Sequence, residues 1–517
     1  MIWDLHTYLM VDWDLVAEQT NTSMVREEPF KYEGNPLIRL EDTHLTLDGR
    51  PLTGRAFGIS LRLLVKEGSI YRLWYAARPH VKSRKRPPRL QLQYAESADG
   101  VHFKPVRVGQ VRWRGSKDNN LIDVAARGAP DARPTGFLHD PLDAEYPYKC
   151  VYQRPASGDE LEPGVAGRWP FLKDREWRFV WGIGRSRDGF AWESPAHEHN
   201  LVNAAPESAH LHRAMDGGLV ISDQMVNPMA EMGGRNVKGW VTYDLETAHR
   251  IPDFLFSLPA HMCRVNAAFN TGAAWDRSAW AQPHVGLVCA RKGPTMVALH
   301  GYLYGATAAE TFAQVADVGL ACSATGIGFR EVWPFRPFIR RGMRGSWDYG
   351  MTAQRFILDA GDETRFYYIG GDVGNLCSNY LPGLATIPRD RYGYRMIEGH
   401  RDTAKRDRRA TLALKPCALP DRPAFAVNVS HVTRSRTVRL ELADEKGRAI
   451  PGYRFENCVP VAREGLRQRV RWKPNRTGEE LKGRRVVIRA ELFSPNCGAV
   501  YYDSPRLYAV YTHQQGD

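Results

Sequence analysis

Short runs that alternate apolar and polar positions recur along the chain and are followed by similar turns. Residues 71–75 (Tyr-Arg-Leu-Trp-Tyr) and 177–181 (Trp-Arg-Phe-Val-Trp) are two such runs. Ser-x-Asp-Gly sequences follow them at 97–100 and 186–189. Alternation with a period of two predicts half-buried strands, and Asp-Gly favours tight hairpin turns. The repeating unit is therefore predicted to be a β-meander, with Asp99 and Asp188 as turn residues.

Weaker copies of this unit continue at 241–244, 320–329 and 366–394, which gives five units over roughly residues 35–400. Each unit is about 70–90 residues long, whereas common propeller blades take about 40–50. The extra length predicts long loops, which is where a binding site is expected. Helical periodicity is nearly absent. The pattern predicts an all-β protein that begins with a five-bladed β-propeller.

After residue 400 the pattern changes to a second all-β segment. Apolar, β-branched runs at 425–428, 438–442 and 486–490 predict strands, and turn sequences separate them. We expect a five-bladed β-propeller over residues 1–400, carrying the active site, and a β-sandwich over residues 401–517.

Composition and charge narrow the function classes. The chain has no run of about 18 apolar residues, so no membrane span is expected. Residues 1–10 lack the order of a signal peptide, which predicts a cytoplasmic protein unless the N-terminus was trimmed. The eight cysteines lie far apart without a Cys-x-x-Cys pair, which argues against structural zinc and favours free thiols.

The net charge of +13 is concentrated in the C-terminal segment. Residues 401–517 hold 24 Lys and Arg against 13 Asp and Glu, a net +11. A basic module can attract an anionic glycan or nucleic acid, although a solvated arginine-rich surface is the simpler interpretation. Nucleic acid is therefore not the expected partner.

Several segments together resemble a known group of proteins. They are 8–18 followed by Gly34-Asn35-Pro36, the aromatic strand 73–75, the run 367–371, and residues 442–453. In this order they are similar to bacterial proteins like the N-terminal domain of glycoside hydrolase family 32. The resemblance implies the five-bladed furanosidase superfamily, which also holds family 43, and activity on carbohydrate.

The resemblance also implies three carboxylates that meet at the mouth of the propeller channel. Two carboxyls about 5–5.5 Å apart retain the anomeric configuration, and about 6.5–9.5 Å leaves room for water and inverts it. One of them must stay protonated to act as the acid.

Mapped onto this sequence, His139-Asp140-Pro141 is similar to the Arg-Asp-Pro motif of family 32, which implies that Asp140 holds sugar hydroxyls and tunes the acid. Glu207 is the implied proton donor. The first-blade strand at 54–60 carries no carboxylate, so Asp348 is the candidate base or nucleophile. This departure leaves retention or inversion open, and it keeps a propeller without catalysis as an alternative.

Each candidate also has a structural interpretation: Asp140 and Asp348 as turn residues, and Glu207 as a solvated loop residue. His210 and His212 share one face of a predicted strand, where core packing, sugar binding or a metal are all conceivable. The remaining candidates for substrate binding are charged or aromatic side chains near these acids. Together the predicted substrate-binding residues are Arg55, His139, His210, His212, Arg213 and Trp347.

The sequence therefore predicts a glycoside hydrolase that cleaves a terminal or furanosidic bond with paired carboxylates at the channel mouth. No cofactor and no metal are expected. The expected partner is a carbohydrate, and the arginines among the candidates are compatible with an anionic one. The alternative is a non-catalytic carbohydrate-binding or scaffold propeller.

Overall fold

The computed structural model describes most of the chain, and every structural statement below concerns those residues. They are 6–38, 58–78, 92–112, 115–123, 133–155, 179–193, 209–226, 235–252, 255–256, 281–304, 315–334, 336–372, 380–398, 409–495 and 503–513. Within these ranges the protein is almost entirely β, with a short 3-10 helix at Glu479–Leu481. The all-β expectation is confirmed.

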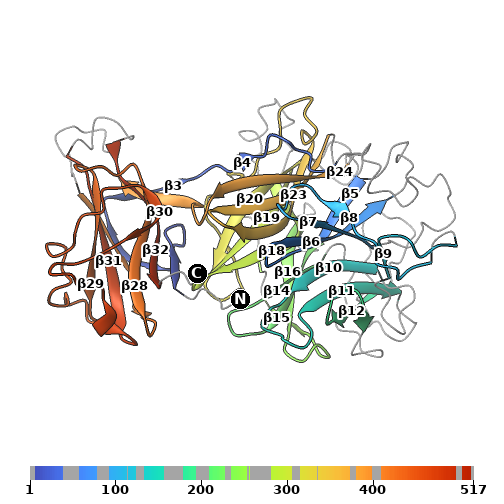
Figure 1. Ribbon diagram of the computed structural model, residues 1–517, viewed down its shortest axis with the longest axis horizontal. Helices are drawn as coiled ribbons and strands as arrows, with labels where there is room; N and C mark the ends of the chain where they lie inside the picture. Colours follow the sequence, from blue (N-terminus) through green and yellow to red (C-terminus); the bar gives the residue numbers. More distant parts are fainter. Residues whose placement is uncertain are drawn as a thin grey trace.

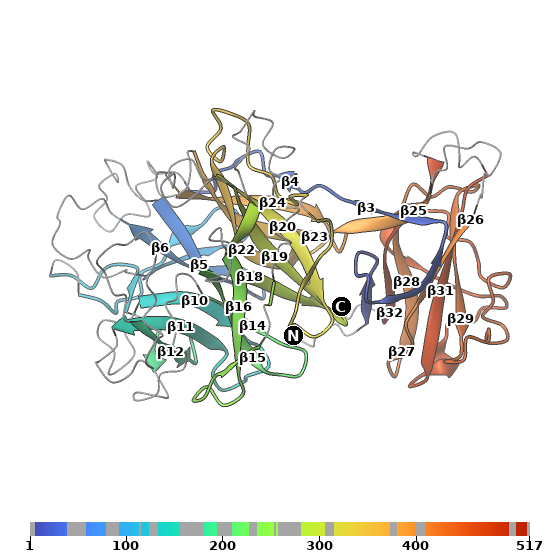
Figure 2. The same cartoon turned by 180° about the vertical axis from the view of Figure 1, so that it is seen from behind.

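Two β units lie side by side (Figures 1 and 2). The larger unit contains five antiparallel meanders in chain order. The first meander contains β5 (Gly58–Glu67), β6 (Ile70–Arg78), β7 (Leu92–Ser97) and β8 (Lys104–Pro105), and β9 (Leu121–Ile122) also pairs with β7. The second contains β10 (Arg133–His139), β11 (Tyr148–Pro155), β12 (Phe179–Ser186) and β13 (Trp192–Glu193). The third contains β14 (His210–Arg213), β15 (Leu219–Val226), β16 (Arg235–Thr242) and β17 (His249–Arg250).

The fourth and fifth meanders form one larger sheet, because a parallel bridge joins them at Ala316 and Met351. The fourth is β18 (Ala281–Lys292), β19 (Thr295–Tyr304), β20 (Val315–Ser323) and β21 (Arg330–Glu331), and the fifth is β22 (Met351–Ala360), β23 (Glu363–Gly371) and β24 (Tyr380–Pro388). The fourth strand of the fifth meander is β4 (Phe30–Lys31), which comes from the start of the chain.

The first strands of these meanders form a closed ring, in which β5 contacts β10, β10 contacts β14, β14 contacts β18, β18 contacts β22, and β22 contacts β5. Glycines allow the close approach. A Cβ on Gly136 of β10 would lie 2.4 Å from the carbonyl oxygen of Ala209, directly before β14, and one on Gly286 of β18 would lie 2.9 Å from His210 Nδ1 of β14. The ring therefore encloses the middle of the unit.

The turn that ends the third strand of a meander is built as the sequence predicts. Ser97 Oγ accepts a hydrogen bond of 2.9 Å from the Gly100 amide, and Asp99 Oδ1 accepts one of 2.8 Å from Val101. Gly100 has a φ of +75°, which favours glycine. The second meander repeats the arrangement, with Asp188 in the same role. Both aspartates are therefore turn residues.

The smaller unit consists of two sheets whose strands come from both ends of the chain. One contains β3 (Thr22–Arg26), β25 (Gly393–Ile397), β32 (Arg506–His513), β28 (Pro423–Ser430) and β30 (Gly465–Arg469), with β1 (Thr7–Leu9) on β32; the other contains β2 (Val16–Thr20), β26 (Arg409–Leu414), β31 (Arg485–Phe493) and β27 (Cys417–Ala418), with β29 (Thr437–Ala443) on β31.

Strands from the start of the chain pair within this unit. Thr7 pairs with Tyr511 and Val16 pairs with Leu414, so residues 7–26 hydrogen-bond to C-terminal strands. Pairing between residues this far apart in sequence leaves no local pattern from which it could be predicted.

Buried contacts join the two units. Leu9 and Ala509 of the smaller unit belong to the same apolar cluster as Val297 and Leu320 of the larger one. The Tyr511 hydroxyl also donates a 3.0 Å hydrogen bond to Asp390. The smaller unit therefore packs against the fourth and fifth meanders.

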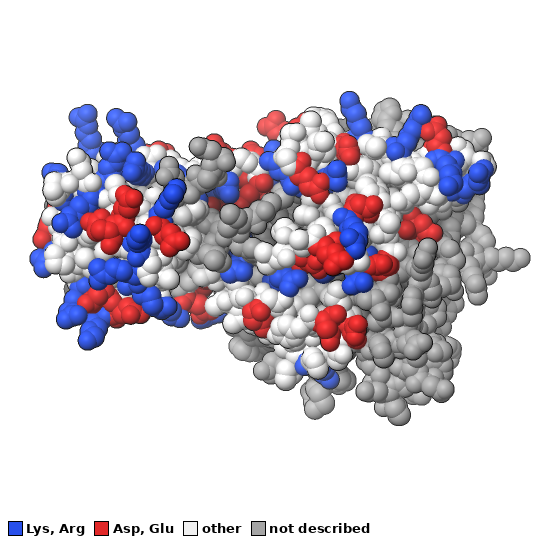
Figure 3. Space-filling model, turned by 60° about the horizontal axis from the view of Figure 1, so that its bottom comes forward, with Lys and Arg blue, Asp and Glu red and all other residues white. Residues whose placement is uncertain are grey.

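Lys and Arg side chains are dense on the smaller unit, where acidic side chains lie between them (Figure 3). Arg489 pairs with Glu441 at 2.9 Å, and Arg485 pairs with Glu445 at 2.7 Å. Part of the basic charge is therefore neutralised within the unit.

Candidate functional site

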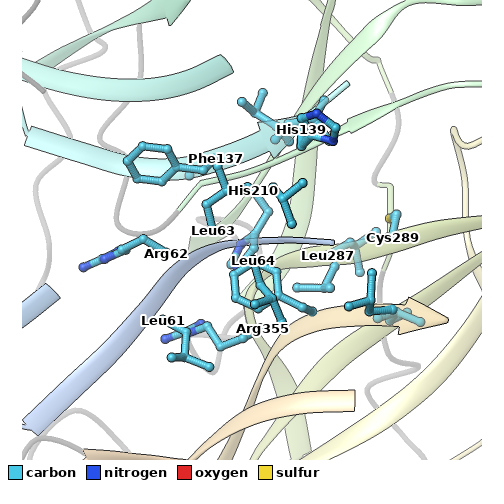
Figure 4. A pocket seen from close by; sticks show the side chains of 18 of the residues that line it. Leu61, Arg62, Leu63, Leu64, Phe137, His139, His210, Leu287, Cys289 and Arg355 are labelled. Carbon is cyan, nitrogen blue, oxygen red and sulfur yellow. The ribbon is translucent and has the colours of Figure 1, made fainter. Parts of the chain in front are cut away.

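A cavity of about 230 Å³ lies inside the ring of first strands. All five of these strands contribute to its lining (Figure 4). The polar side chains among the lining residues are Arg62 and Lys66 of β5, Thr135 and His139 of β10, His210 of β14, and Arg355 of β22. Apolar residues of the same strands make up most of the rest.

The described lining of this cavity contains no aspartate and no glutamate. Its charged side chains are cations: Arg62, Lys66 and Arg355. Glycosidic hydrolysis by the usual route needs two carboxyl groups on either side of the bond. The described lining of this cavity supplies no such pair.

β-Bulges set the direction of both arginine side chains in the lining. The register of β5 against β6 shifts between Leu61 and Leu63, which leaves Arg62 as the extra residue. In the same way, the register of β22 against β23 shifts between Gln354 and Phe356, which leaves Arg355. A bulge re-aims a side chain and is common beside functional sites.

The predicted acid modulator, Asp140, forms a buried ion pair. It follows β10 and is 1% exposed. Arg213 Nε donates a 2.8 Å hydrogen bond to its Oδ2, and a second nitrogen of Arg213 contacts the same oxygen. Lys149 Nζ lies 3.6 Å from it and 2.8 Å from Asp143. Two predicted site residues, Asp140 and Arg213, are therefore brought together, but as partners of each other.

Asp348, the predicted base or nucleophile, is also buried and paired. Lys31 Nζ of β4 lies 2.5 Å from its Oδ2, and the Tyr368 hydroxyl donates to the same oxygen at 3.1 Å. Trp347 stacks on the Tyr368 ring with centroids 5.7 Å apart. Neither Asp348 nor Trp347 lines the cavity inside the ring. These contacts join β4 to the fifth meander, which is a structural role.

The three predicted histidines occupy different environments. His139 lines the cavity, lies 4.9 Å from the Tyr148 ring, and has a pKa lowered by burial. His210 also lines the cavity. The Nε2 of His212 lies 2.8 Å from the Gly326 carbonyl oxygen, and burial lowers the pKa of His212 to about 4. His212 is therefore a core histidine that links the third and fourth meanders.

Glu207 and Arg55, predicted as the proton donor and a substrate-binding residue, lie outside the described residues. Their predicted roles stay predictions. Within the described part of the chain, no cluster of three or more His, Cys, Asp or Glu side chains could hold a metal ion. No described helix is long and apolar enough to cross a membrane.

Sequence reasoning missed Arg62 and Arg355. The available signal was one arginine inside an otherwise apolar strand, in Leu61-Arg62-Leu63 and again in Arg355-Phe356-Ile357. If side chains simply alternated between the two faces of a strand, each arginine would lie on one face of its sheet. A bulge is not visible in such a pattern, so the aim of these side chains could not be predicted.

Comparison with known proteins gives similar structures only. No protein-family model matches the chain, and no curated protein matches it. One solved structure titled "Glycoside hydrolase" has 10% identity and a TM-score of 0.44, over 70% of this chain and 92% of that chain.

A glycosyl hydrolase from Bacteroides ovatus has 16% identity and a TM-score of 0.40, over 71% of this chain and 95% of that chain. A structure titled for the GH130 family of mannoside phosphorylases has 15% identity and a TM-score of 0.40, over 74% of this chain and 97% of that chain. At this level of similarity, the site residues of this chain have to be assigned from its own geometry.

Proposed function

We propose that this protein is a glycoside hydrolase built on a five-bladed β-propeller, with the substrate entering the cavity inside the ring of first strands. The observation that carries the proposal is that the first strands of all five meanders line one cavity. A site where many strand ends converge can present side chains from separate blades to one ligand. The resemblance to the family 32 and 43 superfamily supports carbohydrate as that ligand.

The same proposal divides the chain into two domains. The propeller would run from β4 to β24, and the β-sandwich would combine residues 7–26 with the strands from β25 onward. The sandwich would support the fourth and fifth blades, because its apolar contacts lie there.

Glu207 is the candidate proton donor. It precedes His210 by three residues in the chain, and His210 lines the cavity. A general acid needs a raised pKa so that it stays protonated until it meets the leaving group, and an apolar environment raises the pKa of a carboxyl. The base or nucleophile would come from another segment outside the described residues, since Asp140 and Asp348 are both held in ion pairs.

The second candidate function is carbohydrate binding without catalysis. One specific observation favours it, which is that the described lining of the cavity holds three cations and no carboxylate. A propeller that had lost catalysis would keep the cavity and bind a sugar there without turning it over.

A screen of aryl glycosides, including arabinofuranosides, fucosides and uronides, would test the proposal. We expect turnover of at least one substrate, and a loss of at least 100-fold in kcat for Glu207→Gln, which is typical for a missing general acid. The control Glu145→Gln, at a carboxylate 63% exposed, should keep wild-type turnover. Sugar binding without turnover of any substrate would favour the second candidate, and wild-type turnover in Glu207→Gln would refute the assignment of the acid.

A further inference from the structure

Arg62 and Arg355 occupy equivalent positions on neighbouring first strands. Each is the extra residue of a β-bulge, and β5 and β22 contact each other in the ring. Both line the same cavity, and their side chains extend toward the same side of it, away from His139 (Figure 4). Two guanidinium side chains from neighbouring strands therefore belong to the lining of one cavity.

Arg355 is half-buried and has few partners among the described residues. Its Nη1 donates a 2.9 Å hydrogen bond to the carbonyl oxygen of Gln354, and its buried Nε has no hydrogen-bond partner among the described residues. Burial lowers the pKa of Arg355 to about 10, against a smaller opposing effect of Tyr380. A guanidinium carries five N–H donors, so most of them remain available.

Two buried cations in the described part of the chain have more partners than Arg355. Lys292 lies 3.2 Å from Asp390 and also contacts a second carboxylate. Arg395 donates 2.9 Å hydrogen bonds to the Met10 carbonyl oxygen and to Gln19 Oε1, although its Nη2 has no partner among the described residues. Burying a charge without such partners is costly, and an anion bound in the cavity would offset that cost.

We propose that the ring cavity binds the carboxylate of an acidic sugar, with Arg355 and Arg62 as the cationic donors. The planar fork of a guanidinium matches a carboxylate through two parallel hydrogen bonds. A cavity of about 230 Å³ is smaller than the usual 300–1,000 Å³ of drug-sized sites, so it suits a single uronic acid residue at a chain end. The sugar part of this inference rests on the proposed function, whereas the anion part rests on the arginines.

The test uses calorimetric titration of the full chain with sodium glucuronate, sodium galacturonate, methyl glucoside and sodium sulfate. We expect at least one uronate to bind at least 10-fold more tightly than methyl glucoside. Sulfate binding as tight as uronate binding would overturn the carboxylate assignment in favour of a sulfated ligand. Equal binding of the uronates and methyl glucoside, or no binding of either, would overturn the anion site.

Variants connect the binding to the two arginines. Arg355→Met and Arg62→Met should each weaken uronate binding at least 10-fold, and Arg355→Lys should also weaken it because an ammonium lacks the fork. The control Arg250→Gln changes an exposed arginine on β17 and should bind as the wild type does. Unchanged affinity in both Arg355→Met and Arg355→Lys would overturn the proposal.

Thermal melting gives a second readout that does not depend on turnover. Without ligand, Arg355→Met should melt at or above the wild-type temperature, because it removes a half-buried cation that has few partners. Uronate should raise the melting temperature of the wild type and not that of the variant. Uronate binding in a protein that hydrolyses no glycoside would leave this inference standing while the proposed hydrolysis fails.

Discussion

Replacing Asp140 with alanine tests whether this carboxylate stabilises the fold or acts on substrate. Asp140 is 1% exposed, accepts a hydrogen bond of 2.8 Å from Arg213 Nε, and lies 3.6 Å from Lys149 Nζ. The Lys149 side chain is itself only 1% exposed. Asp140→Ala would remove this partner from the buried Lys149 and from the partly buried Arg213. Lys149 would retain Asp143 and the Tyr146 carbonyl oxygen.

The expected magnitude follows from the burial. Removing one partner of a buried ion pair typically costs about 3–5 kcal/mol of unfolding free energy, because the remaining charge stays desolvated. We therefore expect Asp140→Ala to lose about 3–5 kcal/mol, measured by urea unfolding followed by circular dichroism. Asp140→Asn keeps the shape and one hydrogen-bond acceptor, so it should lose less than Asp140→Ala but still more than a surface variant.

A matched control is Asp118→Ala. Asp118 pairs with Arg107 at 3.0 Å, but its side chain is 58% exposed, so its loss should cost no more than about 1 kcal/mol. If Asp140→Ala unfolds at the same urea concentration as the wild type and only turnover is lost, the structural role argued for Asp140 is wrong. A catalytic role would then be the better explanation of its burial.

Two further outcomes can be measured in the same way. His212 is fully buried, and burial lowers its pKa to about 4, below the unfolded value of about 6.5. Protonation of this histidine therefore favours the unfolded chain. Its contribution to the free energy of unfolding should fall by about 2 kcal/mol from pH 8 to pH 5. His212→Gln should lose this part of the pH dependence, whereas the exposed control His249→Gln should keep it; equal slopes in both variants would contradict the assignment. Lys31→Met should cost about 3 kcal/mol in urea unfolding because it leaves the Asp348 side chain, 3% exposed, without its cation, and an unchanged unfolding midpoint would contradict this.

Local features of the fold could be predicted from the sequence because local interactions determine them. The Ser97-to-Gly100 turn is specified by a hydroxyl, a carboxylate and a glycine within four residues, and the structure contains it as predicted. The all-β class follows from the same local alternation. By contrast, Val16 pairs with Leu414, and nothing near either residue indicates its partner.

The candidate site was harder to predict, because a carboxylate in the sequence gives no sign of what will neutralise it. Asp140 precedes a proline as in a known motif, yet Arg213, which neutralises it, comes from the neighbouring meander. Asp348 meets Lys31, from the other end of the chain. Asp140 and Asp348 were predicted as catalytic residues or turn residues, and neither ion pair was predicted.

The ion pairs of Asp140 and Asp348 also bear on why the described lining of the cavity holds cations rather than acids. A buried carboxylate is stable when a cation pairs with it, and both Asp140 and Asp348 have such a partner. Such acids are satisfied within the protein and have little to offer a ligand. Arg355 lacks a carboxylate partner among the described residues, so a ligand can improve its environment more than that of either acid. In a buried site, the group with unmet hydrogen-bonding capacity is therefore a better guide to ligand binding than the group with the most familiar motif.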